Sequence, residues 1–326
     1  MKRSIQTKFI CLLAFIFAMS ASCGSPPPRA PKVGKTVAFI TNASSDFWKI
    51  ARKGTEKADT ELADVTVVFK TTNTGAVEEQ NGLIRDALDN DRADALAISV
   101  VDPAAQKKLI NEATSRAVVV TQDSDAPDTA RALYLGADNH AAGRQAGELI
   151  KKALPQGGKI MVFVGKRDVQ NARERFDGLK ESLQGSKVEI IDLLTDDADA
   201  GRARENAYQT LKKYPDIAGM VGLWSYNGPA ILQALSPEGK LGQIKIVCFD
   251  DERATLDAIK AGTIFGTVAQ QPFEYGYQAI QNAAKILKGD RSVIPASKTI
   301  LIPTVVIQKN NVDDYTKKLN QLLGIT

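Results

Sequence analysis

A repeating order of apolar strand, loop and amphipathic helix begins at Lys35 and is the feature that most constrains the fold of this chain. The segments with strand character span 36–41, 65–71, 95–99, 117–123, 133–137, 159–165, 187–195, 219–224, 245–250 and 264–270. Helical patterns between most of them span 47–62, 78–90, 104–115, 141–154, 172–183, 202–214 and 274–287. Strands that are apolar on both faces and separated by helices indicate parallel sheets covered on two sides.

The repeat starts again near residues 136–143 (GADNHAAG), where Asp138 or Asn139 can cap the next helix. Ten strands are many for one parallel sheet. The length of 326 residues suggests one large or two medium domains, at roughly 100–200 residues each. The sequence therefore predicts an α/β protein of two lobes, with about five strands in each and a cleft between them.

The first residues differ in character from the rest of the chain. Three basic residues precede an apolar run at 9–19, and small residues follow up to Cys23. A basic start, a short apolar middle and a small-residue cleavage region are typical of a secretory signal. Because a membrane-spanning helix needs about 20 apolar residues, the run is too short to be one. We therefore predict a signal peptide at 1–22 and a chain that leaves the cytoplasm.

The segment SASC (20–23) resembles a bacterial lipobox, in which the cysteine becomes the lipidated first residue. Ser20 stands where that motif usually has an aliphatic residue, so ordinary cleavage nearby remains the alternative. The stretch 23–34 is rich in proline and predicts an extended tether. We therefore expect lipidation at Cys23 and a location in the periplasm or cell envelope, with contact to the membrane only through the lipid.

Composition excludes some partners. The chain is 44% hydrophobic and 25% charged, which is ordinary for a soluble globular protein. Its 42 basic and 38 acidic residues give a net charge of +4, and removal of the three basic residues of the signal leaves +1. No basic excess remains to favour nucleic acid. Beyond Cys23 the sequence has only Cys248, so no internal disulfide is expected.

Polar and aromatic residues follow the predicted strands, at the carboxyl ends where ligands bind in sheets of this kind. The segments are 44–48, 99–102, 123–125, 166–173, 196–199, 224–227, 250–252 and 270–273. They supply carboxylates, amides, arginine and aromatic rings. Planar polar groups hold hydroxyls in paired hydrogen bonds, and rings cover the C–H face of a sugar. This mixture favours a neutral polyol as ligand.

Apparent motifs for catalysis, metals and nucleotides fail on inspection. The VGKT at 33–36 has Arg29 where a phosphate loop requires its first glycine, and no strand precedes it. The run DDADAG (196–201) lacks the spaced ligands of a calcium loop. His140 is the only histidine, which argues against a nucleophile–base pair or a zinc site. We therefore expect no cofactor, no metal and no enzymatic activity.

Several segments together resemble the periplasmic ribose/galactose-type sugar-binding proteins, the solute-binding subunits of ABC importers. The resemblance covers roughly 35–308 and is carried by NARERFDGL (171–179), CFDDERATLDAIKAG (248–262) and GTVAQQPFEYGYQA (266–279), with support from 118–127 and 138–148. It implies a type I periplasmic-binding fold, in which two Rossmann-like lobes with parallel sheets are joined by a three-crossing hinge.

The same resemblance sets the expected lobe boundaries. The crossings are expected near 136–139, 270–272 and 301–304. The N-terminal lobe would then comprise 35–137 plus 271–302, and the C-terminal lobe 138–270 plus 303–326.

The resemblance also implies ligand contacts in the first lobe. In ribose-binding relatives the first strand is followed by an Asn-Pro-Phe-Phe-like segment whose aromatic rings flank the sugar. Ser45, Phe47 and Trp48 stand at that place here, with Trp48 the better candidate for the ring contact. Alternatively, an aromatic residue at the start of a helix belongs to the core. Asp123 matches the family's aspartate after the fourth strand, and Ser124 replaces the arginine that usually follows it.

Further contacts are implied for the second lobe and the hinge. Arg173 matches the arginine that reaches the sugar from the second lobe, Asp250 matches the aspartate of a GFD segment, and Gln270 matches a hinge glutamine. The alternative roles are a surface ion pair for Arg173, a helix cap for Asp250 and a plain hinge position for Gln270.

Two family positions are altered. The second lobe's asparagine position falls around Ser225, with Trp224 and Asn227 beside it, and its stacking phenylalanine would fall near Ala198, which has no ring. Trp224 is the candidate to supply that missing face. Because Ser45, Ser124 and Ala198 all depart from the pattern, we do not carry over ribose itself as the ligand. Ser99, after the third strand, completes the predicted set.

The predicted function is capture of a sugar, a monosaccharide or polyol, by a monomeric protein that delivers it to the permease of an ABC importer. A receptor subunit that presents the same cleft to a chemoreceptor or sensor kinase is the main alternative. A sugar-responsive repressor core is disfavoured by the signal region and by the lack of a basic helix-turn-helix. A carbohydrate enzyme is the remaining alternative.

Overall fold

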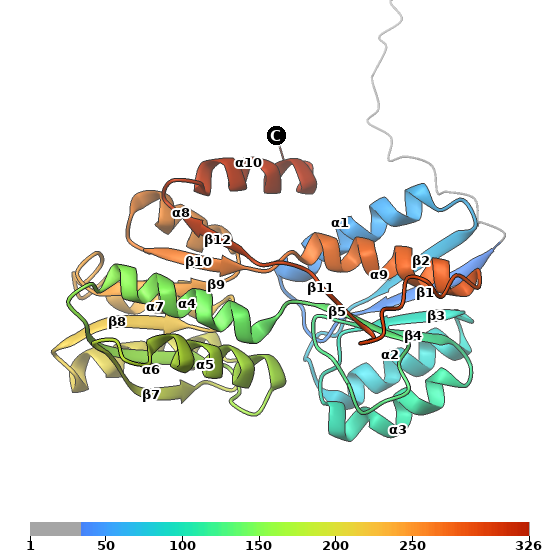
Figure 1. Cartoon of the computed structure of the whole chain (residues 1–326), viewed down its shortest axis with the longest axis horizontal. Coiled ribbons are helices and arrows are strands. Elements are labelled where there is room, and N and C mark those ends of the chain that lie inside the picture. Colours follow the sequence, from blue (N-terminus) through green and yellow to red (C-terminus); the bar gives the residue numbers. More distant parts are fainter. Residues whose placement is uncertain (1–33, 326) are drawn as a thin grey trace, which may run out of the picture. The chain divides into compact units, whose positions relative to one another are not determined.

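Two six-stranded sheets, each covered by helices, form the part of the chain that the structure describes, residues 34–325 (Figure 1). The structure is a computed structural model. We call the first sheet with its helices the N-terminal lobe and the second sheet with its helices the C-terminal lobe. The predicted signal peptide, the predicted tether and Cys23 lie outside the described residues.

The N-terminal lobe contains a sheet with the strand order β11-β5-β4-β3-β1-β2, in which all neighbours are parallel. Its strands are β1 (Lys35–Ile40), β2 (Val65–Lys70), β3 (Ala95–Ile98), β4 (Val118–Gln122), β5 (Leu133–Gly136) and β11 (Thr299–Leu301). Its helices are α1 (Asp46–Glu61), α2 (Val77–Asp89), α3 (Pro103–Thr114) and α9 (Pro272–Leu287).

The C-terminal lobe contains a sheet with the order β12-β10-β9-β8-β6-β7. Its strands are β6 (Gly158–Val164), β7 (Val188–Thr195), β8 (Ile217–Gly222), β9 (Lys245–Phe249), β10 (Gly266–Ala269) and β12 (Val305–Gln308). Its helices are α4 (Asn139–Ala153), α5 (Gln170–Leu183), α6 (Ala200–Lys213), α7 (Asn227–Leu235), α8 (Arg253–Ala261) and α10 (Val312–Leu323). Only the edge pair β10–β12 is antiparallel in this described sheet.

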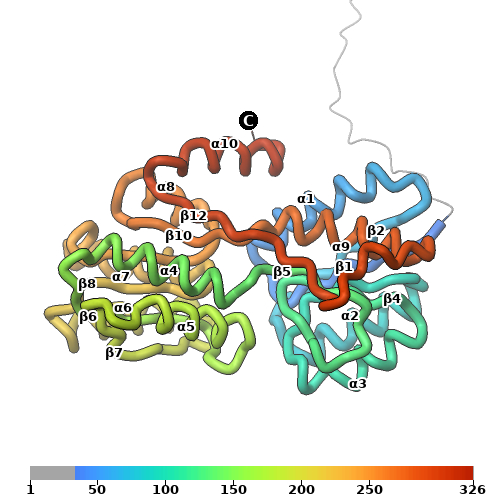
Figure 2. The backbone as a smooth tube through the Cα atoms, in the orientation of Figure 1, coloured from blue at the N-terminus to red at the C-terminus, as the bar shows by residue number. Residues whose placement is uncertain are grey.

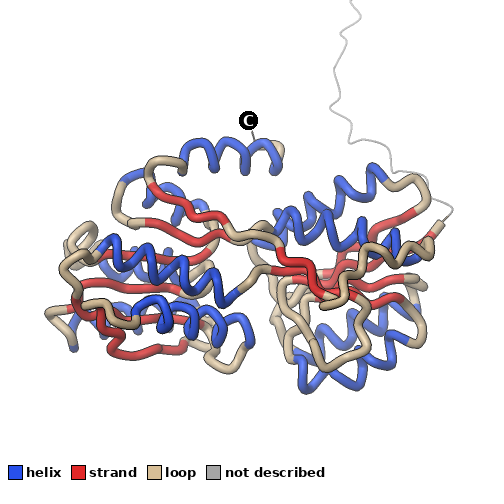
Figure 3. Tube along the Cα trace, viewed as in Figure 1, coloured by secondary structure: helices blue, strands red, loops and turns tan. Residues whose placement is uncertain are grey.

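The cores explain why the strands read as continuous apolar runs. Val37 and Phe39 of β1 belong to one apolar cluster, whereas Ala38 and Ile40 belong to another. Successive side chains of a strand point to opposite faces, so both faces of this sheet are buried under helices. The C-terminal lobe repeats the arrangement, because neighbouring residues of β6 alternate between two clusters. Figure 3 shows the resulting layers of helices around each sheet.

The chain passes between the two sheets three times (Figure 2). The passages lie between β5 and α4, between β10 and α9, and between β11 and β12. The predicted fold of two α/β lobes with a three-crossing hinge is therefore confirmed. Residues 137–138, 270–271 and 302–304 form these hinge segments.

Some elements were not predicted. The helices α7, α8 and α10 and the strands β11 and β12 were missing from the predicted pattern. The two strands are short, with three and four residues. The expectation of parallel sheets is also corrected at one edge, because the chain returns through β12 against the direction of β10. Short strands that are only partly buried carry too weak an apolar signal to be recognised from sequence.

Candidate ligand-binding site

Asp123 lies just after β4 in the N-terminal lobe, with a left-handed backbone (φ 60°) and a nearly buried side chain. The Ser99 hydroxyl donates to its Oδ2 at 2.8 Å, and Asn42 Nδ2 approaches the same oxygen at 3.4 Å. Burial raises the pKa of Asp123 to about 6, against the lowering effect of the Ser99 hydrogen bond. The structure thus brings together two residues of the predicted site, Ser99 and Asp123. Ser124, also predicted, is half-buried beside them.

Asp250 lies just after β9 in the C-terminal lobe and is built in the same way, with φ 64° and 5% exposure. Its Oδ1 accepts hydrogen bonds from Gln270 Nε2 at 3.0 Å and from the Gln270 backbone N–H at 3.3 Å. The Tyr275 hydroxyl in turn donates to Gln270 Oε1 at 3.2 Å. Burial raises the pKa of Asp250. The predicted pair of Asp250 and Gln270 therefore forms one buried unit at a hinge crossing.

The charge of Arg175 acts on both carboxylates, although its hydrogen bonds go to other residues. Burial raises the pKa of Asp123 and of Asp250, the positive charge of Arg175 opposes that rise in both, and the charge of Asp250 adds to it for Asp123. The three groups thus lie within electrostatic reach of one another. Arg175 is 1% exposed, its Nε donates to Asn139 Oδ1 at 3.0 Å and its Nη1 donates to the Leu223 carbonyl at 2.8 Å. We call Asp123, Arg175 and Asp250 the charged cluster.

One donor of Arg175 is left free. Its Nη2 is buried and has no hydrogen-bond partner among the described residues. The guanidinium carbon lies 4.5 Å from the centre of the Phe249 ring. A buried charged donor is costly unless it is hydrogen-bonded, so the free N–H is a position at which a ligand oxygen would be stabilised.

Close helix packing positions Arg175. A Cβ at Gly143 of α4 would lie 2.1 Å from the Arg175 carbonyl oxygen, and a Cβ at Gly178 of α5 would lie 2.0 Å from the His140 carbonyl oxygen. Only glycine fits at both places, so α4 and α5 approach closely and bring the second turn of α5 against Asn139.

Arg173, predicted as the arginine at the site, lines the cleft but is not the arginine of the charged cluster, so its contact with a ligand stays a prediction. Arg173 is exposed and donates to the backbone carbonyl of Asp168. Residues two positions apart on a helix are rotated by about 200° around its axis, so the side chains of Arg173 and Arg175 lie on opposite faces of α5. The segment NARER contains both arginines, and only the identification of the buried face of α5 separates them. Arg175 is the functional candidate that sequence reasoning missed.

The aromatic pair after β1 is also reassigned. Trp48 is 4% exposed and belongs to the apolar core, with its ring centre 6.2 Å from Phe39 and 4.9 Å from Phe47. Trp48 therefore packs in the core, which is the alternative role given for it above, and its contact with a ligand stays a prediction. Phe47 is half-buried and lies 6.1 Å from Tyr275 between ring centres. Ser45, also half-buried, precedes α1 without capping it through its side chain.

The predicted residues after β8 make hydrogen bonds within the C-terminal lobe. Both ends of the buried Asn227 amide are used, since Oδ1 accepts from the Trp224 N–H at 2.9 Å and Nδ2 donates to Asp196 at 3.1 Å. Asn227 is therefore a structural residue and not a free ligand group. Trp224 is half-buried and its Nε1 donates to Asn171 at 3.1 Å. Burial raises the pKa of the Glu252 carboxyl, and a hydrogen bond with Ser225 opposes that rise.

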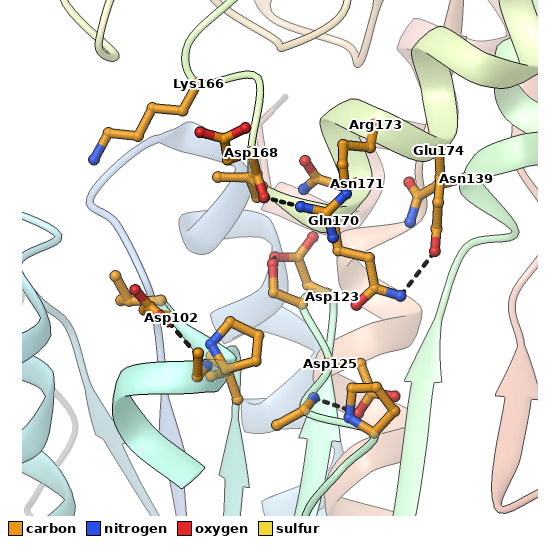
Figure 4. A pocket seen from close by; sticks show the side chains of 18 of the residues that line it. Asp102, Asp123, Asp125, Asn139, Lys166, Asp168, Gln170, Asn171, Arg173 and Glu174 are labelled. Atoms are coloured by element: carbon orange, nitrogen blue, oxygen red, sulfur yellow. Dashed lines mark hydrogen bonds between the residues drawn. The ribbon is translucent and has the colours of Figure 1, made fainter.

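A cleft of about 1420 Å³ is lined by both lobes. Its walls include the segments 75–77, 100–104, 123–129, 137–140, 166–171 and 173–174. Figure 4 shows Asp123 and Asp125 on one side, with Gln170, Asn171 and Arg173 of α5 on the other. Asp123, Ser124 and Arg173 are the predicted residues in this lining, and the other predicted residues lie outside it: Ser45, Phe47, Trp48, Ser99, Trp224, Ser225, Asn227, Asp250 and Gln270.

The site has groups that bind hydroxyls and shows no arrangement for metal or nucleophilic chemistry in the described part of the chain. No group of three or more potential metal ligands occurs among residues 34–325. His140 contacts Arg144 at 2.7 Å and Glu181 at 3.2 Å. Cys248 is unpaired and buried, and burial raises the pKa of its thiol to about 12. In the same described range, no helix is both long and apolar enough to span a membrane.

The two-lobed fold and the polar cleft define the class of a hinged ligand-binding protein, and comparison with known proteins gives its family. The periplasmic binding protein domain matches residues 37–291. The ribose import binding protein of Salmonella typhimurium is 24% identical over 288 residues, covering 88% of this chain and 95% of that protein. The chain therefore belongs to the periplasmic binding protein family.

Solved structures agree with this assignment. An ABC transporter solute-binding protein from Burkholderia graminis, in complex with D-arabinose, has a TM-score of 0.80 at 26% identity, over 88% of this chain and 99% of its own. A complex of XylFII with LytSN has a TM-score of 0.77 at 27% identity, over 85% of this chain and 99% of its own.

Proposed function

We propose that this chain is an extracytoplasmic solute-binding protein that captures a sugar, a monosaccharide or polyol, and delivers it to an ABC importer. The observation that carries the proposal is the charged cluster. It presents two carboxylates and one guanidinium with a free N–H, a set that can accept from and donate to the hydroxyls of one neutral molecule. Relatives named for ribose import and for D-arabinose binding support a sugar as the ligand.

In this proposal Asp123 and Arg175 bind the sugar from the two lobes, and Asp250 and Gln270 contact it at the hinge. Ser99 and Ser124 support the first carboxylate. Phe47 is the ring that covers the apolar face, with Trp224 as its counterpart. Ligand binding between two lobes favours a closed arrangement, because only that arrangement makes both sets of contacts.

The further features of the proposal are a monomeric protein, anchored by lipid at Cys23 in the periplasm or cell envelope, that releases its sugar unchanged. Relatives that are binding proteins support the absence of turnover. Mass spectrometry of the purified protein tests the anchor through a mass shift at Cys23. The same method applied to the released ligand tests for chemical change.

Titration calorimetry tests the central proposal. D-ribose, D-arabinose, D-allose, D-galactose and D-glucose are each added to the chain, and one or more is expected to bind with a stoichiometry of one. Arg175→Met is expected to abolish the heat, whereas Lys180→Met, a control on the exposed face of α5 and outside the cleft lining, retains it. No heat for any sugar, together with no thermal shift, would overturn the proposal.

A receptor subunit is the second candidate, because one structural relative was solved in complex with a second protein, LytSN. The two functions differ in the partner of the sugar-loaded chain. Transport predicts that the loaded protein stimulates a reconstituted permease–ATPase complex, whereas sensing predicts binding to a membrane sensor without transport. Neighbouring permease and ATPase genes would favour transport, and an adjacent sensor kinase gene would favour sensing.

A further inference from the structure

The last helix, α10, packs against both lobes. Its buried residues Val312 and Leu319 share an apolar cluster with Ile50 of α1 and with the core of the C-terminal lobe. Figure 1 shows α10 running from α8 toward α1, and it contacts both helices as well as β12. It begins after residue 291, where the match to the family domain ends, so the family match assigns it no role.

A hydrogen bond from α10 reaches the segment that carries Asp250, one member of the charged cluster. The Tyr315 hydroxyl donates to Asp251 Oδ2 at 2.7 Å. Asp251 is 7% exposed, and burial raises its pKa to about 6, against the lowering effect of this bond. Asp251 directly follows Asp250, so a side chain of α10 fixes the residue next to a proposed ligand group.

Asp250 needs such support because its backbone is strained. A φ of 64° is unfavourable for a residue with a Cβ and persists only where the surroundings determine it. Four hydrogen bonds act on Asp250 from β10 and the hinge: its N–H donates to Val268, its carbonyl accepts from Thr267, and its carboxylate accepts from the side chain and the backbone N–H of Gln270. On the C-terminal side of Asp250 the chain continues to Asp251, whose carboxylate accepts the hydrogen bond from Tyr315.

We propose that Tyr315 is a positioning residue for the cleft: through Asp251 it holds Asp250 in the left-handed conformation that presents its carboxylate to the ligand. The contribution to affinity rests on the proposed function, in which Asp250 binds the sugar. The positioning itself does not, because it concerns the ligand-free chain. Since α10 also packs on α1, it links the segment of Asp250 to the helix that begins beside Phe47.

Hydrogen exchange of the ligand-free full chain tests the positioning. Tyr315→Phe keeps the ring and removes the donor, and Tyr277→Phe is the matched control, since the Tyr277 hydroxyl also donates to a carboxylate, Glu61, at 2.7 Å on the exposed surface. We expect faster exchange in peptides covering 247–252 and 266–272 for Tyr315→Phe only. Unchanged exchange in both peptides would overturn the inference, whatever the ligand.

Calorimetry with the same sugar panel tests the consequence for affinity. Tyr315→Phe is expected to weaken sugar binding about tenfold, the effect of leaving a buried carboxylate without its donor. Asp251→Asn retains an oxygen that accepts the Tyr315 proton and should stay within about threefold of the original affinity. In an Asp251→Ala background Tyr315→Phe should have no further effect, and an equal loss in both backgrounds would contradict the proposed route.

The two proposals fail in different ways. If the original chain binds no sugar of the panel, the proposed function falls, while the exchange experiment still decides the role of Tyr315. If the chain binds a sugar and Tyr315→Phe binds it equally well, with unchanged exchange at 247–252, only the role of Tyr315 is lost.

Discussion

The loops after β4 and β9 share one backbone design. Each begins with an aspartate in the left-handed region, Asp123 at φ 60° and Asp250 at φ 64°. Each aspartate donates its N–H to the next strand of its sheet at 3.0 Å, to Leu135 in β5 and to Val268 in β10. The repeat shows how a strand end can turn a carboxylate back over the sheet. Both lobes use it to bring one buried acid to the charged cluster.

The two loops differ in what holds the carboxylate. Asp123 is bound by Ser99, at the end of a neighbouring strand of its own sheet. Asp250 is bound by Gln270, which lies in a crossing between the lobes, and is followed by Asp251, which α10 holds. The N-terminal carboxylate is thus fixed within its lobe, whereas the C-terminal one depends on the hinge. A hinge movement should therefore be felt at Asp250 more than at Asp123.

The largest effect should come from Arg175, whose positive charge acts on the aspartates of both loops. Arg175→Met leaves two buried carboxylates without their counter-charge, so we expect a loss of about 3–5 kcal/mol in the free energy of unfolding. Chemical unfolding measures this loss. Arg173→Met, on the exposed face of the same helix, should change stability by less than about 0.5 kcal/mol. Equal losses for the two variants would contradict the assignment of Arg175.

The aromatic pair offers a second contrast, between a ring in the core, Trp48, and a ring proposed to contact the ligand, Phe47. Trp48→Ala removes a buried ring and should lower the free energy of unfolding by about 3–5 kcal/mol. Phe47→Ala removes a half-buried ring and should cost less stability, but weaken sugar binding. Urea unfolding and calorimetry separate the two effects. A Trp48→Phe variant that folds stably and loses only binding would restore Trp48 as a ligand contact.

The sequence predicted most of the fold because the buried strands and amphipathic helices have clear periodicities. It singled out Asp123 and Asp250, which the structure holds in matching left-handed turns, because both follow apolar strands at positions that match a known family. It did not separate Arg173 from Arg175 or Trp48 from Phe47, because in each pair two adjacent or near-adjacent residues compete for one role. That choice depends on which face of a helix is buried, and burial follows from long-range packing such as the approach of Gly143 and Gly178. The strands β11 and β12 were missed because they are short and only partly buried, whereas α10 was missed although its sequence is amphipathic.

The pH dependence of stability tests the burial of Asp123. Its pKa is raised from 3.8 to about 6, so between these values the unfolded chain has released a proton that the folded chain retains. The free energy of unfolding should therefore fall as pH rises from about 4 to about 6, by up to about 3 kcal/mol from this group. Asp123→Asn removes this pH dependence of the unfolding free energy. As pH rises over this range, the variant should therefore gain stability relative to the original chain. Urea unfolding at pH 4, 5 and 6 measures the difference.

A constant difference between the two proteins across that range would mean that Asp123 is solvated and ionised in the fold. Asp250 offers the matched comparison, because burial also raises its pKa. Asp250→Asn should change the slope in the same direction. If only one of the two substitutions did so, the electrostatic equivalence of the two loops would be lost.

The smallest effect concerns the hydroxyls that fix the two left-handed aspartates. The Tyr134 hydroxyl donates to the Asp123 carbonyl at 2.9 Å, and the Thr267 hydroxyl donates to the Asp250 carbonyl at 2.8 Å. Tyr134→Phe and Thr267→Val keep the shape and remove the donor, so each should cost about 1 kcal/mol of unfolding free energy. If the C-terminal loop depends on the hinge, Thr267→Val should also weaken sugar binding more than Tyr134→Phe does. Equal affinities for the two variants would show that both loops are fixed in the same way.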